Sequence, residues 1–441
     1  MTTTKYKHRF VARIVLEAAT PLALSSGFPD IVTDAPVARD VNGLPYIPGS
    51  SLAGLLRHSL CGKSYFDSLF GYQKNEGGQG SRLIVSDALI VGKDGRAVDG
   101  LQNVEHDEFL KKFDSLPVRQ HVAIDSAGTA KKSCKFDEEV VFAGTRFCFE
   151  MEILSENGDS SEMHDIVEAM ASPMFRIGGG TRNGFGSMKV VRVQYAAYDL
   201  SNREDLEAYL QKSSSLADSW KATCVDVDGG NYEGWIKYTL MLQPVDFFLF
   251  SSGFGDEDAD MTSVKEQRVC WDSDVPRMSD NYFVVPGTSV KGAVAHRTAY
   301  HWNRFNRRFV DDGQAVDCSK NPAVISIFGT CEDSDEISPQ IGNAIFSDVF
   351  LSNTPEKVIY HVKIDKFTGG TIDGALFQEK VAMANDQQLC EEIFVRKEAL
   401  EDDTTKKAFE QALRDICNGL LPLGGGTNRG NGIFTGTMKI E

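Results

Sequence analysis

An internal duplication constrains this chain more than any other feature of its sequence. The motifs SSGF, P-G-[ST]-S, H-V-x-I-D and GGGT each occur twice, and in the same order. The spacing between partner motifs grows only slightly along the chain, as small insertions would produce. A repeat of this length predicts two homologous domains. We place them at residues 1–197 and 234–441, joined by a polar linker at 198–233 that contains a short helix.

Both copies have the same predicted order of secondary structure: a strand, a loop, a helix, several strands, a second helix, a strand, the glycine-rich loop and a last strand. Helices are predicted over residues 52–60 and 162–170 in the first copy, and over 290–302 and 404–418 in the second. This order is typical of an α+β, ferredoxin-like sheet with helices on one face. Such a sheet is a common platform for binding RNA.

Length and composition place the chain among ordinary globular proteins, since 441 residues with 41% hydrophobic composition can bury a large core. No stretch approaches about 18 uninterrupted apolar residues, and the N-terminus lacks an apolar run before a small-residue cleavage site. We therefore expect no membrane span and no signal peptide, and predict a cytoplasmic protein. The nine cysteines contain no CxxC pair and no zinc-like spacing with histidine, which indicates reduced thiols.

The net charge restricts how this chain can bind a nucleic acid. There are 46 Lys and Arg residues against 63 Asp and Glu residues, which gives a formal charge of −17. A protein that binds nucleic acid through bulk electrostatics carries a basic charge instead. Any binding of RNA by this chain therefore depends on local patches.

The two glycine-rich loops are IGGGTRNGFG at 177–186 and LGGGTNRGNG at 423–432. Glycine at this density permits positive φ and lets main-chain N–H groups face an anion, while the arginine adds a charged contact. Neither loop is a Walker loop or a dinucleotide fingerprint, because no Gly-Lys-Ser/Thr and no helix follows. We predict contact with an RNA backbone; the alternative is a tight turn packed on the neighbouring helix. The predicted contacts are Gly179, Gly180, Arg182, Gly184, Gly425, Gly426, Arg429 and Gly430.

The P-G-[ST]-S motifs predict a second anion site in each copy. Each motif starts a helix, where free N–H groups and hydroxyls can bind phosphate, and basic residues follow. The alternative is an ordinary helix cap after a proline turn, in which the same hydroxyls are the capping groups. The predicted RNA contacts are Ser50, Ser51, Arg57, Thr288, Ser289 and Lys291.

An acidic loop follows each SSGF motif and carries the catalytic hypothesis. Counting nine residues from Ser25 reaches Asp34, and counting nine from Ser251 reaches Asp260. A carboxylate on a loop beside RNA can hold Mg²⁺ or act as general base on a 2′-hydroxyl, and either promotes in-line attack on the adjacent phosphodiester. The alternative is a solvated acidic loop.

The two H-V-x-I-D motifs place His121 and His361 four residues before Asp125 and Asp365. Residues four apart in a strand lie about 13 Å apart on one face, too far for a hydrogen bond. We interpret the histidines as structural or RNA-stacking residues. The Ser-Asp pairs at 86–87 and 347–348 are interpreted as turn formers at strand ends.

Three segments together resemble a known family: residues 25–57, residues 124–147 and the first glycine loop. They are similar to the CRISPR-associated RAMP superfamily, specifically to the backbone subunit of type III effector complexes. The resemblance covers residues 8–192 closely and 234–441 less tightly. It implies that the chain is a fusion of two backbone subunits for antiviral defence.

The resemblance also implies a modified RNA-recognition fold for each domain, with subunits stacked along a CRISPR guide RNA. A thumb hairpin, matching residues 119–146 and 360–384, would wedge into the duplex of guide and target. Sequence is then read by RNA pairing rather than by protein, which removes the objection from net charge. The implied partners are guide RNA, complementary target RNA, further backbone subunits and a large polymerase-like subunit.

In such subunits an aspartate on the loop before the PGSS helix cleaves target RNA with a divalent metal. Asp34 falls on that position, so Asp34 and Asp260 are the predicted catalytic and metal-binding residues, with Mg²⁺ (or Mn²⁺) as cofactor. Asp260 lacks the proline that follows Asp34, and Asp256 or Asp258 can replace it. Two alternatives stay open: a non-catalytic guide-RNA scaffold, and a metal-free processing nuclease that acts through histidine.

Overall fold

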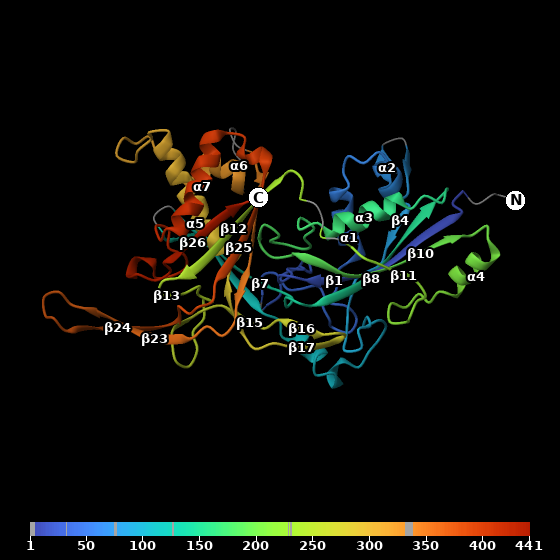
Figure 1. Ribbon diagram of the computed structural model, residues 1–441. Helices are drawn as coiled ribbons and strands as arrows, with labels where there is room; N and C mark the ends of the chain where they lie inside the picture. Colours follow the sequence, from blue (N-terminus) through green and yellow to red (C-terminus); the bar gives the residue numbers. More distant parts are fainter. Residues whose placement is uncertain are drawn as a thin grey trace.

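The chain folds into two similar halves that lie side by side, with the first half on the right and the second on the left in Figure 1. The computed structural model describes residues 5–31, 33–74, 77–125, 128–227, 229, 232–330 and 338–441. Strands and seven α-helices alternate in the described residues of the two halves, so the predicted α+β class is confirmed.

The first half is built on one antiparallel sheet in the order β11-β10-β1-β8-β4, with the short strand β5 also paired to β8. Helices α1, α2 and α3 belong to this half, and α1 and α3 contact each other. The bounds of these elements are β1 His8–Ala18, α1 Gly49–Ser59, α2 Phe66–Phe70, β4 Leu83–Val85, β5 Leu89–Ile90, β8 Arg146–Ser155, α3 Ser161–Ala171, β10 Met188–Asp199 and β11 Thr223–Val225.

The second half repeats this sheet in the order β26-β12-β25-β21, and a strand from the first half, β9, completes it. Helices α5 and α7 pack against each other over this half. The bounds are β9 Asn183–Gly184, β12 Trp235–Pro244, α5 Gly287–Phe305, α6 Pro322–Phe328, β21 Ala344–Ser347, β25 Leu389–Arg396, α7 Asp403–Cys417 and β26 Phe434–Ile440. In both sheets the last long strand of the half, β10 or β26, therefore pairs with its first strand, β1 or β12. That first strand pairs on its other side with β8 or β25.

Shorter elements connect these sheets. The remaining strands are β2 Tyr72–Lys74, β3 Gly77–Gln79, β13 Phe247–Phe248, β14 Met261–Thr262, β15 Lys265–Glu266, β16 Val269–Asp272, β17 Val275–Met278, β18 Tyr282–Val285, β19 Gly329–Thr330, β20 Gln340–Ile341 and β22 Val349–Leu351. Among the helices described, we find none with the length and apolar composition that a bilayer-spanning helix needs. The cysteines described are free thiols, as predicted, and Cys331 lies outside the described residues.

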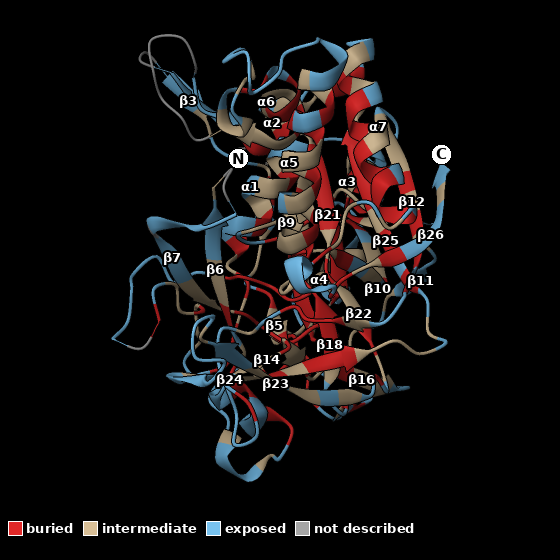
Figure 2. Cartoon of the chain, turned by 90° about the vertical axis from the view of Figure 1, so that its left-hand side faces the viewer, coloured by how far each residue is buried: buried red, intermediate tan, exposed pale blue. Residues whose placement is uncertain are grey.

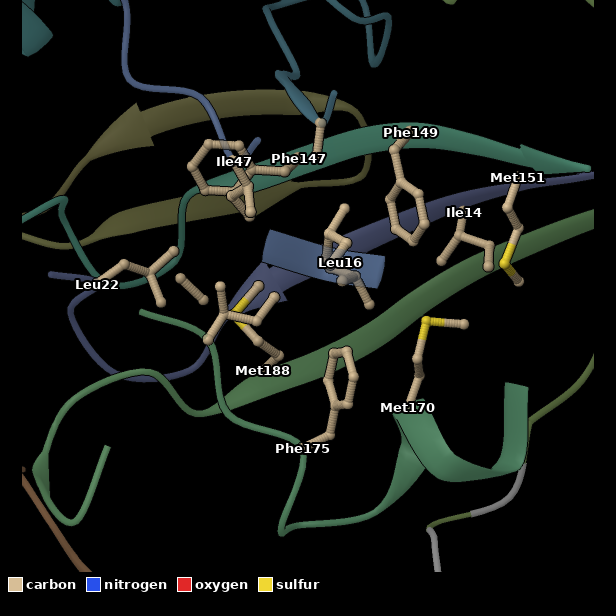
Figure 3. Packing of buried hydrophobic residues seen from close by; sticks show 14 of the residues in the cluster. Ile14, Leu16, Leu22, Ile47, Phe147, Phe149, Met151, Met170, Phe175 and Met188 are labelled. Atoms are coloured by element: carbon tan, nitrogen blue, oxygen red, sulfur yellow. The ribbon is translucent and has the colours of Figure 1, made fainter. Parts of the chain in front are cut away.

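Each half has its own apolar core between sheet and helices. In the first, Ile14 and Leu16 of β1 lie at the centre, with Phe149 of the neighbouring strand and Met170 of α3 packed against them (Figure 3). In the second, Phe409 and Leu413 of α7 occupy the corresponding place over β12. Burying apolar surface stabilises a fold by about 25 cal/mol per Å². This gain explains why the apolar helix faces identified by periodicity turn toward the sheets.

A long β-hairpin leaves each half at the place predicted for a thumb. The first consists of β6 (Val118–Ile124) and β7 (Ala130–Glu139), and the second of β23 (Glu356–Ile364) and β24 (Thr371–Met383). The second hairpin extends far from the body of the protein (Figure 1). Both expose large apolar side chains, namely Val122, Ile124, Phe136, Tyr360, Val362, Ile364, Phe367 and Leu376.

Much of the predicted linker belongs to the first half. Its predicted helix is α4 (Arg203–Gln211), which begins at the capping residue Asn202, and β11 then pairs with β10. The buried guanidinium of Arg13 on β1 explains this docking, because it donates to the carbonyl of Asp218 at 2.6 Å and to that of Ser215 at 3.2 Å. A buried cation without such acceptors would destabilise the fold.

The second half carries extra residues before its PGTS motif, and they form the hairpin β16–β17. This hairpin lies against the first half, where Val269 joins the apolar core. The indole of Trp271 donates to the carbonyl of Gly144 at 2.7 Å, and the N–H of Val269 donates to the carbonyl of Ala143 at 2.8 Å. The insertion therefore holds the two halves together.

Candidate functional site

The first glycine loop forms a direct connection between the halves. Its strand β9 adds to the edge of β21 in parallel, with Asn183 opposite Phe346 and Gly184 opposite Ser347. Figure 2 shows β9 beside β21 and the start of α5. The loop therefore extends the sheet of the second half instead of standing free.

Polar side chains reinforce this connection. The Nε of Arg182 donates to the carbonyl of Gly342, and the ammonium of Lys291 donates to Oδ1 of Asn183 at 2.8 Å. Burial, with a smaller effect of nearby Arg182, lowers the pKa of Lys291 to about 8. The guanidinium of Arg176 donates to Oγ of Ser347 at 2.8 Å, and burial lowers its pKa to about 10.

A buried cluster of three charged side chains, the ion triad, lies beside strand β9. Arg119, at the base of β6, pairs with Glu266 and, at 2.9 Å, with Asp348; the side chains of all three are at most 5% exposed. Burial raises the pKa of Asp348, although Arg119 opposes this shift. For Arg119 burial acts to lower the pKa, but the two carboxylates outweigh it and raise the pKa. Each charge depends on the others for its compensation.

Three predicted RNA contacts thus have protein partners. Arg182, Gly184 and Lys291 lie in the contact between the halves, which no pattern in the sequence had indicated. Gly184 has φ +118°, and a Cβ there would lie 2.0 Å from Oδ1 of Asp348. The close approach of protein, rather than of RNA, therefore explains this glycine.

We expect Gly184→Ala to lower the free energy of unfolding by about 1–3 kcal/mol more than Gly430→Ala, because overpacking adds to the strain of a positive φ. Gly430 has φ +95°, and an added Cβ meets nothing within 4 Å, so it is a matched control. Thermal and denaturant unfolding without RNA measure the difference. Equal losses in the two variants would show that contact with Asp348 is unimportant.

Main-chain N–H groups of the two glycine loops bind protein carbonyls, where the prediction had them facing an anion. The N–H of Gly179 donates to the carbonyl of Ala23 at 2.8 Å, and the N–H of Gly425 donates to that of Leu249 at 2.7 Å. These two N–H groups hold the loop on the segment before SSGF and do not face an anion. The tight-turn alternative therefore explains part of each loop, although its partner is that extended segment rather than a helix.

The helix starts also differ from the prediction. The capping residues are Pro48 and Pro286, and no side chain caps these helices through a hydroxyl. Ser50, Ser51, Thr288 and Ser289 lie in the first turn. The first N–H of each helix donates instead to an aspartate, Gly49 to Asp87 at 2.7 Å and Gly287 to Asp348 at 2.8 Å. The aspartate of each Ser-Asp pair thus caps a helix, a role that requires contact across the fold.

Arg57 and Arg429, both predicted RNA contacts, also have protein partners. Arg57 donates to the carbonyl of Gly71 at 3.0 Å. Arg429 pairs with the buried carboxylate of Glu379 and lies over the ring of Phe377 at 5.7 Å. Its side chain is still 39% exposed, so it can also reach a ligand.

Three of the repeated motifs meet at one cleft of about 420 Å³ in the first half. Ser25 of SSGF, Ser51 of PGSS and Gly179 of the glycine loop line it, together with Arg176. A second cleft of about 570 Å³ adjoins it, since Leu55 and Arg176 line both, and it runs between the halves. Its charged lining residues are His58, Lys63, Arg176, Arg182 and Arg396 on the basic side, and Asp165, Glu168 and Glu233 on the acidic side. Lys63 pairs with Asp165 at 3.0 Å, so the excess of positive charge in this cleft is small.

The two predicted catalytic aspartates occupy equivalent places at the base of the hairpins. Oδ2 of Asp34 accepts the N–H of Asp137 on β7 at 3.1 Å, and Oδ2 of Asp260 accepts the N–H of Gln378 on β24 at 2.8 Å. In both copies the next residue pairs in parallel with the hairpin strand. Both aspartates are exposed.

The surroundings of these aspartates differ in charge. Asp34 lies beside a second carboxylate, Asp137, whose Oδ1 accepts the N–H of Asp34 at 2.9 Å. Near Asp260 the ammonium of Lys380 binds Asp256 at 2.6 Å and Asp258 at 2.9 Å. Lys380 is the main cause of the lowered pKa of Asp256. Asp256 and Asp258 are thus paired with a cation, which argues against either replacing Asp260.

The donor set at Asp34 suits a magnesium ion in part. No cluster of three or more metal-binding side chains occurs among the residues described. Mg²⁺ is commonly held by one or two carboxylates, with water and substrate phosphate completing its octahedron. The carboxylates of Asp34 and Asp137 each keep one oxygen outside their reciprocal hydrogen bonds, and can supply this minimal set.

The histidines of the two H-V-x-I-D motifs support the hairpins. His121 stacks on Phe136 at 4.9 Å and pairs with Glu138 at 2.8 Å. His361 stacks on Phe377 at 4.7 Å and pairs with Glu379 at 2.9 Å. These contacts orient the strand that binds Asp34 or Asp260, and they agree with a structural role for the histidines.

The family model described as the RAMP superfamily matches residues 15–189 and 244–435, one region in each half. No curated protein matched the chain.

Proposed function

Because the chain belongs to the RAMP superfamily of CRISPR-associated RNA-binding proteins, with one matching region in each half, we propose that it is a backbone subunit of a type III effector complex, acting in antiviral defence in the cytoplasm. Each half is a modified ferredoxin-like, RNA-recognition-type domain, and the chain is a fusion of two such subunits. Further backbone subunits and a large polymerase-like subunit complete the complex.

The convergence of three repeated motifs on one cleft is the observation that carries this proposal. Guide RNA would pass along the cleft of the first half, beside Ser51 and Gly179, and over the cleft between the halves. The fully or partly exposed groups proposed to contact RNA are Ser50, Ser51, Gly179 and Gly180 in the first half, and Thr288, Ser289, Gly425, Gly426, Arg429 and Gly430 in the second. Base pairing, not protein, would then select the target.

The hairpins fit a role in the duplex of guide and target. Apolar side chains inserted between base steps unstack them and kink a duplex. Phe367 at the tip of the second hairpin is 85% exposed and Tyr360 is 66% exposed, while Phe136 on the first is 50% exposed. We propose that these side chains separate a base pair at each half and so present a target phosphodiester to the nearby aspartate.

Asp34 is the proposed centre of RNA cleavage. A bound Mg²⁺ or Mn²⁺ would neutralise charge on the scissile phosphate. The chain itself holds the Asp34 carboxylate in place through the N–H of Asp137. From this place the carboxylate can accept the proton of the 2′-hydroxyl or orient that hydroxyl for in-line attack, while the 5′-oxygen of the next nucleotide leaves.

A non-catalytic scaffold is the second candidate, and one observation favours it for the second half. Where the first half has Asp137, the second has Gln378, so Asp260 has no carboxylate at the equivalent position. A single carboxylate binds a divalent cation more weakly than two. We propose that Asp260 cuts more slowly than Asp34.

Metal removal tests the nuclease proposal against its alternatives. The chain is assembled with its complex on a guide RNA, and end-labelled complementary RNA is added with Mg²⁺, with EDTA, or with EDTA followed by excess Mn²⁺. We expect EDTA to lower the cutting rate by at least about 100-fold, and Mn²⁺ to restore it. Non-complementary RNA is the control and should stay intact.

Other results would redirect the assignment. Binding of complementary RNA without cutting in Mg²⁺ would support the scaffold. Cutting that persists in EDTA would support a metal-free processing nuclease.

A further inference from the structure

The contact between the halves uses two different surfaces. The donor surface, on the first half, consists of strand β9 and the side chains of Arg119, Arg176 and Arg182. The acceptor surface, on the second half, consists of the edge of β21 with Ser347 and Asp348. Because the halves are repeats, each has segments at the positions that correspond to these two surfaces.

The first half has an acceptor surface that nothing in the described chain covers. Strand β4 ends the first sheet, as β21 would without β9, and its Ile84 is 53% exposed. Asp87 is the equivalent of Asp348, since each accepts the first N–H of the PGSS or PGTS helix. Asp348 is buried and binds Arg119, whereas Asp87 is exposed, with its second oxygen unpartnered in the part of the chain that the structure describes.

An unpaired strand edge of this kind readily pairs with another chain. An acidic edge repels phosphate, so protein suits it better than RNA does. Asp40 is at the same spacing from SSGF as Glu266, which pairs with Arg119 in the contact between the halves. In the first half, Oδ1 of Asp40 accepts the N–H groups of Asn42 and Leu44. The pattern in the second half, where carboxylates receive an arginine, indicates that a partner of β4 supplies arginine too.

A second copy of this chain does not offer that arginine. The two halves can be aligned on His121 with His361 and on Gly178 with Gly424. In this alignment the second half has no arginine at the three positions that correspond to the arginines of the donor surface. The residues there are Ile359, Pro422 and Asn428. Docking of one copy's second half on another's first half would leave Asp87 without a cation.

We propose that the β4 edge, with Asp87, binds a different protein subunit that presents an arginine and a short loop strand, and does not bind a second copy of this chain. This proposal rests on the proposed function, because it places the partner next to the first half in the stack of backbone subunits. The chain would therefore enter each complex with a fixed neighbour on one side.

The test uses Asp87→Arg and Asp87→Asn in the full chain, affinity-purified from cells that express all subunits and the guide. Asp87→Asn keeps an acceptor for the helix N–H and removes only the charge. Asp226→Arg is the matched control, because it reverses an exposed aspartate just after β11, at the opposite edge of the same sheet. Native mass spectrometry counts the subunits, and the guide RNA is quantified in the same samples.

We expect Asp87→Arg to lower the recovery of one neighbouring subunit at least tenfold and Asp87→Asn to lower it less, while Asp226→Arg leaves it unchanged. Guide RNA bound to this chain should remain, and its absence from the wild-type complex would instead count against the proposed function. Full recovery of every subunit with both Asp87 variants would overturn the inference. So would wild-type chain that forms oligomers with itself which Asp87→Arg dissolves.

Discussion

Complementary RNA cut by the wild-type complex is expected to lose the cut made by the first half when Asp34 is replaced by asparagine. The rate at that position should fall by about 100-fold or more, as is typical when a positioned acid–base group is removed. Asparagine keeps the oxygen that accepts the N–H of Asp137, so the hairpin and the bound guide should be retained. Gel analysis of end-labelled products, with guide RNA measured in parallel, gives both quantities.

Three further variants make this result specific. Asp260→Asn should remove a second and slower cut, since Asp260 has Gln378 where Asp34 has Asp137. Asp137→Asn should slow only the first cut, because Asp137 is the second carboxylate at that site. Asp30→Asn changes an exposed aspartate on the same loop and should leave both cuts unaltered. An unchanged product pattern in the double variant of Asp34 and Asp260 would refute the nuclease assignment.

Replacing Arg119 by alanine should destabilise the chain by about 3–5 kcal/mol, the usual effect of leaving buried charges without their partner. Glu266 and Asp348 would stay buried, with no cation to compensate them. The free energy of unfolding from denaturant titration measures the loss. We expect this loss of stability in the absence of RNA as well, and we expect the contact between the halves to be weakened most.

Two controls separate burial from charge in this experiment. Arg203→Ala removes the exposed pair with Glu207 and should cost no more than about 0.5 kcal/mol. Combining Arg119→Met with Glu266→Gln and Asp348→Asn removes all three charges, while the amide oxygen introduced at position 348 can still accept the N–H of Gly287. This triple variant should regain most of the stability. A loss for Arg119→Ala as small as that for Arg203→Ala would mean that the triad does not hold the halves together.

Local patterns were sufficient to predict the long helices α1, α3, α5 and α7. The apolar spacing of α7 and the glycine after it predicted a helix over 404–418, and the structure has it at Asp403–Cys417. The equal count from SSGF to Asp34 and Asp260 predicted equivalent residues, and both accept an N–H from the same position of their hairpins. The helix pattern and the count from SSGF both depend on residues close together in sequence, which is why one copy could be read from the other.

Those local patterns could not predict contacts between segments that lie far apart in the sequence. Serine and threonine at a helix start are usual caps. Here Asp87 and Asp348 accept the first N–H of each helix instead, from another part of the fold. Glycine and arginine in a loop are equally compatible with phosphate and with protein. Only the fold showed that Arg182 and Gly184 contact the second half.

The sequence by itself determined that the chain is a tandem repeat of an α+β domain in the RAMP superfamily, because repetition and hydrophobic periodicity are properties of the linear order. Only the tertiary structure decided how one repeat docks on the other, which glycine loop is covered, and which acidic edge stays open. Those outcomes depend on the burial of charges such as Arg119 and Asp348, which lie far apart in the chain and meet only when both halves have folded.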